Sequence, residues 1–287
     1  MANLSEYDTS KTWQAVLASS QRITADSADE VRNLTLHIPD AGFNYQVGQS
    51  IGVIVPGPHP FGNNQHLRLY SIAGESIAPN NRGVAFDLCV RRCFYIDEVS
   101  GERYPGIASN HLCDAKPGAA IKISGPYGSH FKTPEDNSGN LLMIGTGTGI
   151  APFRAFLKRV YQRHGEWKGQ VRLYYGARTG MEMLYRNDKN ADLTLYYDQD
   201  TFKAFEALSR KPWLGEENAI EQALQHHAQD VWNLMQDDNT FVYLAGLEKI
   251  STALDAAMSQ AAKSANRWRW LRQEMMEQGR WAELLYS

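Results

Sequence analysis

Cysteine is scarce in this chain of 287 residues, which contains only three. Cys89, Cys93 and Cys113 form neither a C-x-x-C pair nor the spacing of a disulfide framework. This count and spacing argue against a structural zinc site, an iron–sulfur cluster and a disulfide-stabilised scaffold. A reducing compartment is therefore expected, and we predict a cytoplasmic protein.

Long apolar runs and an excess of basic charge are also missing. No apolar stretch approaches the roughly 20 residues of a membrane-spanning helix, and the N-terminus has no basic or apolar region typical of a secretory signal. The 29 basic and 32 acidic residues give a formal net charge of −3, which does not suggest nucleic acid as a partner. The composition is that of an ordinary globular protein without an integral membrane segment, and it leaves the oligomeric state open.

The most informative segment that is present is a glycine-rich run. Residues 141–144 are apolar, residues 145–149 read Gly-Thr-Gly-Thr-Gly, and helical spacing begins at Ile150, with Pro152 in the first turn. The run matches neither G-x-G-x-x-G nor G-x-x-x-x-G-K-[ST]. A strand, a glycine loop and a helix N-terminus in this order place backbone N–H groups around an anion, which predicts a phosphate site. A turn that merely lets strand and helix pack closely remains the alternative at this point.

The pattern of the chain changes near residue 138. Before it, β-rich segments separated by Gly, Pro and Asn are typical of a closed or sandwiched antiparallel sheet; they are residues 13–20, 31–37, 50–55, 67–72, 84–90 and 120–124. After it, candidate strands alternate with helical segments, as in a parallel sheet with crossover helices; they are residues 141–144, 171–175, 192–197 and 240–244. We predict two domains, a six-stranded antiparallel β-barrel (1–138) followed by a Rossmann-like α/β domain (139–287).

Several motifs in collinear order carry a family resemblance. Arg68-Leu69-Tyr70-Ser71 combines a cation, a flat aromatic ring and a hydroxyl group on one predicted strand. Together with residues 48–53, 88–92, 106–110, 113–118, 145–154 and 238–243, it resembles the ferredoxin–NADP reductases, particularly those of the plant (plastid) type. The resemblance covers nearly the whole chain. It implies an FAD-binding barrel, an NADP(H)-binding α/β domain, and exchange of hydride with NADP(H) and of single electrons with a separate ferredoxin or flavodoxin.

The resemblance also implies roles for residues of the first domain. Tyr70 would lie against the flavin ring, Ser71 would hydrogen-bond its N5 edge, and Arg68 would neutralise the pyrophosphate. Tyr95 matches the family's adenine-stacking aromatic residue, which favours FAD over FMN. The remaining residues of the implied flavin set are Leu69, Cys89, Val90, Arg91, Gly106, Ile107, Ala108 and Ser109.

In the second domain, the resemblance implies a dinucleotide site. The residues implied to contact it are Gly147, Thr148 and Gly149 at the pyrophosphate, Gly246 and Leu247 near the nicotinamide, and Ser209 and Arg210 at the 2′-phosphate. The chain departs from the family at Glu217 and Ala219, where a lysine and an adenine-stacking tyrosine are usual. Lys211, Arg178 and Trp213 are the candidates to compensate, and we expect NADPH to be preferred.

The hydride site departs from the family pattern as well. The cysteine that the family places beside the nicotinamide is Ala245, and its late glutamate maps to Leu284. We name Ser71, Tyr286 and Glu283 as the catalytic candidates, with Tyr286 covering the second face of the flavin. Because a shift of one residue turns an extended side chain to the opposite face, Glu283 replaces the missing glutamate only if the tail bends.

Two other functions stay open on the sequence. The chain could be an NAD(P)H-dependent reductase component serving an oxygenase or another dedicated partner. It could also be a weakly catalytic, flavin-bound redox-sensing protein. Since the chain has no iron–sulfur cysteine motif, the one-electron acceptor is expected to be a separate protein.

Overall fold

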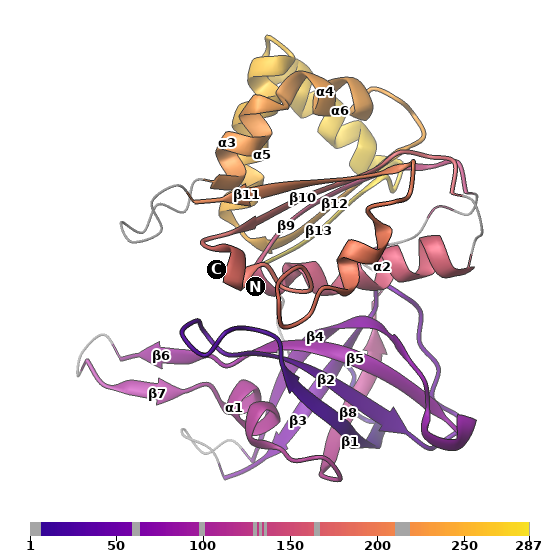
Figure 1. Cartoon of the computed structure of the whole chain (residues 1–287), viewed down its shortest axis with the longest axis vertical. Coiled ribbons are helices and arrows are strands. Elements are labelled where there is room, and N and C mark those ends of the chain that lie inside the picture. Colours follow the sequence, from indigo (N-terminus) through magenta and orange to yellow (C-terminus); the bar gives the residue numbers. More distant parts are fainter. Residues whose placement is uncertain are drawn as a thin grey trace. The chain divides into compact units, whose positions relative to one another are not determined.

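The computed structural model describes residues 7–58, 64–97, 101–128, 131, 134, 137–163, 167–209 and 219–286. The chain divides into two compact units, Met1–Ser129 and His130–Ser287, which are coloured from indigo to magenta and from magenta to yellow in Figure 1. The predicted boundary at residue 138 lies slightly later in the chain than this division.

The first unit is built on a closed barrel of six antiparallel strands with the order β1-β2-β5-β4-β3-β8. The strands are β1 (Thr12–Arg22), β2 (Val31–Ile38), β3 (Ser50–Pro56), β4 (Gln65–Ser76), β5 (Val84–Arg91) and β8 (Ala120–Tyr127). Alternate side chains such as Leu34, Phe86 and Ile123 are fully buried and fill the interior. The predicted six-stranded barrel is therefore confirmed, and each predicted segment falls on one of its strands.

Outside the barrel strands, the first unit forms elements that the sequence did not predict. These are the short 3-10 helix η3 (Pro79–Asn81) before β5, and then a two-stranded hairpin, β6 (Phe94–Ile96) and β7 (Arg103–Pro105), and the helix α1 (Ile107–Asp114). Ala108, Leu112 and Cys113 attach α1 to the barrel core. Burial raises the pKa of the Cys113 thiol to about 11, so this thiol is a neutral packing group at physiological pH. Helix α1 is thus held against the barrel by its apolar face.

The second unit contains a five-stranded parallel sheet with the order β11-β10-β9-β12-β13. The strands are β9 (Asn140–Thr146), β10 (Val171–Ala177), β11 (Phe202–Leu208), β12 (Thr240–Leu247) and β13 (Trp281–Tyr286). The chain moves outward from β9 to one side and then returns to the other side at β12. In such sheets ligands bind beyond the carboxyl ends of the strands at this switch point, so the site is expected beside the ends of β9 and β12.

Helices cover both faces of this sheet. Figure 1 shows α2 (Ile150–Arg163) on one face of the sheet. The other face is covered by α3 (Ala219–His226), α4 (Ala228–Met235), α5 (Lys249–Ala261) and α6 (Ala265–Glu277). The side of the four helices holds a continuous core that includes Trp232, Trp268 and Trp281. The predicted Rossmann-like domain is confirmed.

One predicted strand of this domain is wrong. Residues 192–197 do not form a strand: Asp192–Tyr196 is the 3-10 helix η6, and the outer strand of the sheet is β11. Leu193 and Tyr196 are the buried residues of η6, and their spacing of three matches a 3-10 turn. The Asp192 carboxylate accepts hydrogen bonds of 2.8 and 2.6 Å from the buried Arg154 of α2, which ties this segment to a helix rather than to the sheet.

Candidate functional site

The Arg68–Ser71 segment lies in β4, where it pairs with β3. Ser71 is opposite Ser50, and Tyr70 is opposite Ile51. The hydroxyl oxygens of Ser50 and Ser71 are 3.4 Å apart, so the two groups restrain one another. Strand alternation places Arg68 and Tyr70 on one side of β4 and Leu69 on the other. The structure therefore brings a cation, an aromatic ring and a hydroxyl group together on adjacent positions of one strand, as predicted.

Tyr70 is partly buried and packs against the barrel core. Burial raises the pKa of its phenol group; the thiol of Cys93 raises it further, and the charge of Arg68 lowers it. The phenol is therefore neutral at physiological pH. Its ring offers a flat, uncharged surface beside a cation and a hydroxyl group, which suits a flavin ring.

The arginines near this strand differ in how far they are already paired. Arg91 forms an ion pair of 2.6 Å with Asp29, and Arg92 pairs with Glu30 and with a second carboxylate on α1. Arg68 is exposed, and within the described part of the chain its guanidinium group has no ion-pair partner. Arg68 is thus the cation most available to a pyrophosphate, whereas Arg91 would have to share or leave Asp29.

The N-terminus of α1 forms the second part of this candidate site. Gly106 is the N-cap residue, and its N–H donates to the carbonyl of Cys93 over 2.9 Å. The Ser109 hydroxyl accepts a hydrogen bond of 3.1 Å from the Cys93 N–H. A Cβ on Gly106 would lie 3.0 Å from Ser109 Oγ and 3.2 Å from the Cys93 carbonyl, so a side chain at this position would crowd both atoms. Since the first N–H groups of a helix have no partner within it, Ile107 and Ala108 present donors that fit a phosphate group.

Tyr95 lies on the β6–β7 hairpin and is 54% exposed. Its ring stacks on Tyr104, with 5.3 Å between the ring centres and an interplanar angle of 19°. Sequence reasoning missed Tyr104. The signal was present, because the two tyrosines flank Gly101, a turn residue, and pair across the hairpin. Cys89 and Val90 are buried in β5, so they contribute packing and backbone to the site.

In the second unit, the glycine run forms the 3-10 turn η4 (Gly147–Gly149) between β9 and α2. Gly147 has a φ of +53°, and its carbonyl accepts a hydrogen bond of 2.9 Å from the hydroxyl of Tyr175. A Cβ on Gly149 would overlap the carbonyl group of Ala245 and lie 2.7 Å from the N of Gly246. Both glycines are therefore needed by the backbone, and the loop leaves N–H groups at a helix N-terminus for a phosphate.

The end of β12 closes against the end of β9. Gly246 has a φ of +131°, and a Cβ there would lie 2.6 Å from Thr146 Oγ1 and 2.8 Å from the Thr146 carbonyl. The N–H of Leu247 donates to Thr146 Oγ1 over 3.2 Å. The structure thus joins the predicted residues Gly246 and Leu247 to the glycine loop at the switch point of the sheet.

Two of the residues predicted to recognise a 2′-phosphate lie at neighbouring strand ends. Ala177 of β10 is opposite Leu208 of β11, so Arg178 and Ser209 follow paired positions. The Arg178 guanidinium donates hydrogen bonds of 3.1 and 2.8 Å to the Glu182 carboxylate. Ala219 begins α3. The other residues considered there lie outside the described residues; they are Arg210, Lys211, Trp213 and Glu217.

The C-terminal candidates lie on opposite faces of β13. The strand pairs with β12 without interruption from Trp281 to Tyr286, so the tail does not bend in the way that the predicted role of Glu283 required. The Glu283 carboxylate accepts hydrogen bonds of 3.2 Å from Arg272 and from Trp281, on the side of α6. The Tyr286 hydroxyl lies 3.3 Å from that of Thr148, beside the glycine loop. The structure joins Tyr286 to the nucleotide loop and does not bring Glu283 to it.

Ala245 and Leu284 occupy paired positions of β12 and β13. Ala245 is fully buried, and its carbonyl group is the one that Gly149 approaches. Because Leu284 is two residues before Tyr286, strand alternation places it on the same face of β13 as Tyr286. The two departures from the family pattern therefore fall next to the glycine loop.

The donor sets fit the phosphates of two dinucleotides. Each unit presents glycine backbone at a helix N-terminus. The first unit adds two accessible aromatic rings and Arg68, which has no ion-pair partner within the described part of the chain. Among the described residues there is no cluster of His, Cys, Asp or Glu that could hold a metal ion. Nor does any described helix combine the length and apolar character needed to cross a bilayer. The fold and the two sites define a two-domain oxidoreductase of the flavin and pyridine-nucleotide class.

Comparison with known proteins agrees with this class. Residues 14–132 match the family described as oxidoreductase FAD-binding domain, and residues 143–256 match the oxidoreductase NAD-binding domain. The leaf isozyme 1 of chloroplastic ferredoxin–NADP reductase from Arabidopsis thaliana is 35% identical over 272 residues, which cover 92% of this chain and 75% of that protein. The chain belongs to the ferredoxin–NADP reductase family, and it uses FAD and NADP(H).

More distant relatives share the same fold. A ferredoxin–NADP reductase from Thermosynechococcus vestitus is 33% identical over 273 residues, covering 93% of this chain and 70% of that protein. The crystal structure of ferredoxin–NADP+ reductase from Plasmodium falciparum superposes with a TM-score of 0.72 at 20% identity, covering 98% of each chain. The family resemblance and the fold class predicted from the sequence are confirmed.

Proposed function

We propose that this chain is an FAD-dependent ferredoxin–NADP(+) reductase, which exchanges hydride with NADP(H) and single electrons with a separate ferredoxin. The observation that carries the proposal is that each unit has its own candidate dinucleotide-binding site. The chain is also similar over 92% of its length to a plant ferredoxin–NADP reductase. Flavodoxin is proposed as a second carrier. Reduction of cytochrome c by NADPH should require added ferredoxin or flavodoxin; a rate equal without either carrier contradicts the carrier proposal.

The bound FAD supplies the redox chemistry, because it accepts the electron pair of a hydride and returns electrons one at a time. The chain binds and orients it. Ser71, restrained by Ser50, presents a hydroxyl donor to the N5 edge, and Tyr70 presents the flat ring. Arg68 neutralises the pyrophosphate together with the N–H groups at the start of α1.

On the nucleotide side, the Gly147–Gly149 loop binds the pyrophosphate of NADP(H) through backbone N–H groups. Because the Thr148 hydroxyl lies within contact distance of the Tyr286 hydroxyl, a nucleotide phosphate that binds Thr148 competes with Tyr286. Tyr286 then leaves the loop and gives the nicotinamide its place. Glu283, committed to Arg272 and Trp281, anchors β13 to α6 rather than handling a proton.

Anaerobic titration of the purified protein with NADPH and, separately, with NADH tests this function. The flavin absorbance should bleach with NADPH at a lower concentration than with NADH. If dithionite bleaches the flavin and NADPH does not, hydride exchange is excluded, and the redox-sensing alternative gains support.

Tyr95 is expected to select FAD over FMN by stacking on the adenine. Tyr95→Ala should raise the Kd of FAD about tenfold, since stacking of a base on an aromatic side chain contributes about 1–3 kcal/mol. The Kd of FMN, which has no adenine, should not change. Tyr95→Phe keeps the ring stacked on Tyr104 and serves as the control. Equal weakening of FAD and FMN would show that the ring supports the hairpin and not the adenine.

Arg178 is expected to contribute to the preference for NADPH. Arg178→Gln should lower kcat/KM for NADPH about tenfold and leave the value for NADH unchanged, because only NADPH has the 2′-phosphate dianion. Glu182→Gln is the matched variant, since it releases Arg178 from its bidentate pair and should raise the preference for NADPH. A proportional loss with both nucleotides in Arg178→Gln would place Arg178 outside the 2′-phosphate site.

A further inference from the structure

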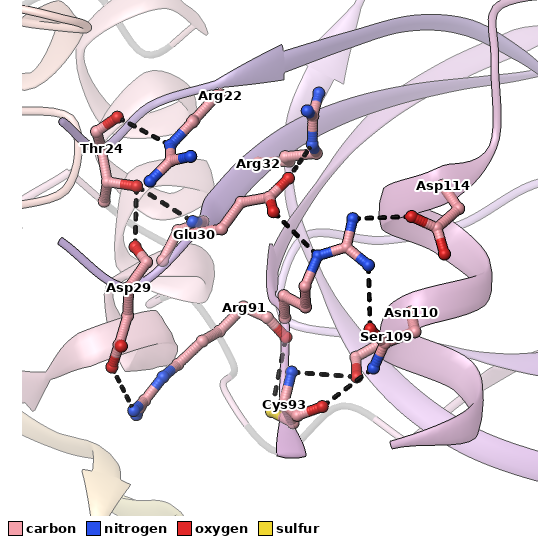
Figure 2. Close-up of polar contacts among 12 residues, drawn as sticks. Arg22, Thr24, Asp29, Glu30, Arg32, Arg91, Cys93, Ser109, Asn110 and Asp114 are labelled. Atoms are coloured by element: carbon pink, nitrogen blue, oxygen red, sulfur yellow. Dashed lines mark hydrogen bonds and ion pairs between the residues drawn. The ribbon is translucent and has the colours of Figure 1, made fainter. Parts of the chain in front are cut away.

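The guanidinium group of Arg92 joins three parts of the first unit. It follows β5 directly, and its nitrogens donate hydrogen bonds of 2.8 Å to Glu30 Oε2, to Asn110 Oδ1 and to Asp114 Oδ1. Figure 2 shows the three acceptor residues, Glu30, Asn110 and Asp114. The Arg92 side chain is only 18% exposed. All of its charge is thus directed at protein acceptors, and it has no role in the flavin set predicted from the sequence.

The contact with Asn110 determines how that amide is oriented. A guanidinium group can only donate, so the atom it contacts must be the carbonyl oxygen of the amide. The amide nitrogen of Asn110 then points the other way, and it donates hydrogen bonds of 2.9 Å to the Cys93 carbonyl and 2.8 Å to the Gly106 carbonyl. Arg92 therefore orients the amide that donates to the carbonyls of Cys93 and Gly106, and both of these carbonyls lie at the start of α1.

Cys93 and Gly106 also form part of the proposed phosphate-binding site at the start of α1. Gly106 is the N-cap of α1, and its N–H donates to the Cys93 carbonyl, while the Cys93 N–H donates to Ser109. Figure 2 shows Cys93, Ser109 and Asn110 in this arrangement. Because the Gly106 and Cys93 carbonyls are both satisfied by Asn110, the helix start is held by side chains and its first N–H groups are left for a ligand.

The charges around Arg92 favour this arrangement. Asp114 is the last residue of α1, where a negative charge interacts unfavourably with the helix dipole. The positive charge of Arg92 offsets this interaction. Hydrogen bonds to Asp114 and Glu30 raise the pKa of Arg92 above its ordinary value. Burial alone would raise the pKa of Glu30, but hydrogen bonds and charges of Arg92 and Arg32 lower it overall. The Glu30 carboxylate is therefore ionised at physiological pH and helps to keep Arg92 in place.

We propose that Arg92 is a positioning residue for FAD binding, which orients Asn110 and so fixes the N-terminus of α1 on which the pyrophosphate of FAD rests. This inference rests on the flavin seat proposed above. Arg92 acts without touching the phosphate, in contrast to Arg68. Its effect should therefore be confined to flavins that carry phosphate groups.

The experiment compares FAD with riboflavin, which has no phosphate, by quenching of flavin fluorescence on the apoprotein. Arg92→Met should raise the Kd of FAD roughly tenfold or more, in keeping with the loss of a charge-assisted hydrogen bond, and change the Kd of riboflavin less than about twofold. Arg32→Met is the matched control, because Arg32 also pairs with Glu30 but does not contact Asn110. It should leave both values unchanged. If Arg92→Met does not fold, Arg92→Lys replaces it, since lysine keeps the charge but not the planar fork.

A double-mutant cycle tests whether Arg92 acts through Asn110. In an Asn110→Ala background, Arg92→Met should weaken FAD binding little further. Multiplicative losses would overturn the proposal, as would equal weakening of FAD and riboflavin, which indicates general destabilisation. Gly106→Val distinguishes an error in the proposed flavin site from an error in the proposed role of Arg92. If it leaves the Kd of FAD unchanged, the flavin seat itself is wrong; if it weakens FAD and Arg92→Met does not, only the role of Arg92 is overturned.

Discussion

Gly149→Ala is expected to weaken the binding of NADPH strongly, so that NADPH reduces the flavin only at high concentration, and to leave FAD bound. The added Cβ would overlap the Ala245 carbonyl and approach the N of Gly246 to 2.7 Å, and these are backbone atoms that cannot rotate away. The loop or the end of β12 must shift, which costs several kcal/mol in a packed site. We expect the KM for NADPH to rise by about 100-fold or more, corresponding to roughly 2.7 kcal/mol.

Gly180→Ala is the matched control for this loop. It lies in the same unit, and a Cβ there meets no atom within 4 Å. Its anaerobic reduction by NADPH should follow the wild-type rate. If Gly149→Ala does not fold, Gly147→Ala replaces it, because its φ of +53° makes any Cβ unfavourable without a clash against backbone. Wild-type reduction of Gly149→Ala would show that the glycine run only packs a strand against a helix, the alternative left open by the sequence.

Ser71→Ala is expected to slow the reduction of the flavin by NADPH on the order of 100-fold, the size of effect seen when a preorganised donor is removed from a reacting atom. The proposed donor is the Ser71 hydroxyl, 3.4 Å from that of Ser50 and directly opposite it in the β3–β4 pair. Stopped-flow absorbance under anaerobic conditions measures this rate. The Kd of FAD should change little, because phosphate contacts and adenine stacking are retained.

Two variants separate the hydroxyl group from the packing of the strand. Ser71→Thr keeps a hydroxyl donor on a β-branched side chain that suits a strand, and it should retain a larger part of the rate. Ser50→Ala removes only the restraining neighbour and should have a smaller effect than Ser71→Ala. An unchanged rate in Ser71→Ala would remove Ser71 from the catalytic candidates.

Segments with strong local periodicity were predicted well from the sequence. The six barrel segments were recognised because they are alternating or β-rich and are separated by Gly, Pro and Asn. Strand alternation predicted that Arg68 and Tyr70 share a face of their strand, whereas their flavin roles came from the family resemblance and stay predictions. In the same way, the glycine run predicted its own strand–loop–helix structure, since the conformations of Gly147 and Gly149 are requirements of the local backbone.

Elements decided by long-range contacts were not predicted. Residues 192–197 alternate like a strand, yet the ion pair between Asp192 and Arg154 joins them to α2 as a 3-10 helix. Strand β11 was overlooked, because its position depends on pairing with β10 and not on its own pattern. Tyr104 was missed although Gly101 signalled a turn, because its stacking on Tyr95 depends on how the hairpin pairs the two residues.

The sequence alone determined the class of fold and the family, because these depend on local periodicity and on short motifs in a fixed order. The tertiary structure decided which interaction partners the charged side chains have. Among the described residues it gives Arg68 no ion-pair partner, commits Arg92 to Glu30, Asn110 and Asp114, and turns Glu283 toward Arg272 rather than toward the nucleotide loop. The physical reason is that a side chain's partner depends on the three-dimensional approach of distant segments, which no local pattern encodes.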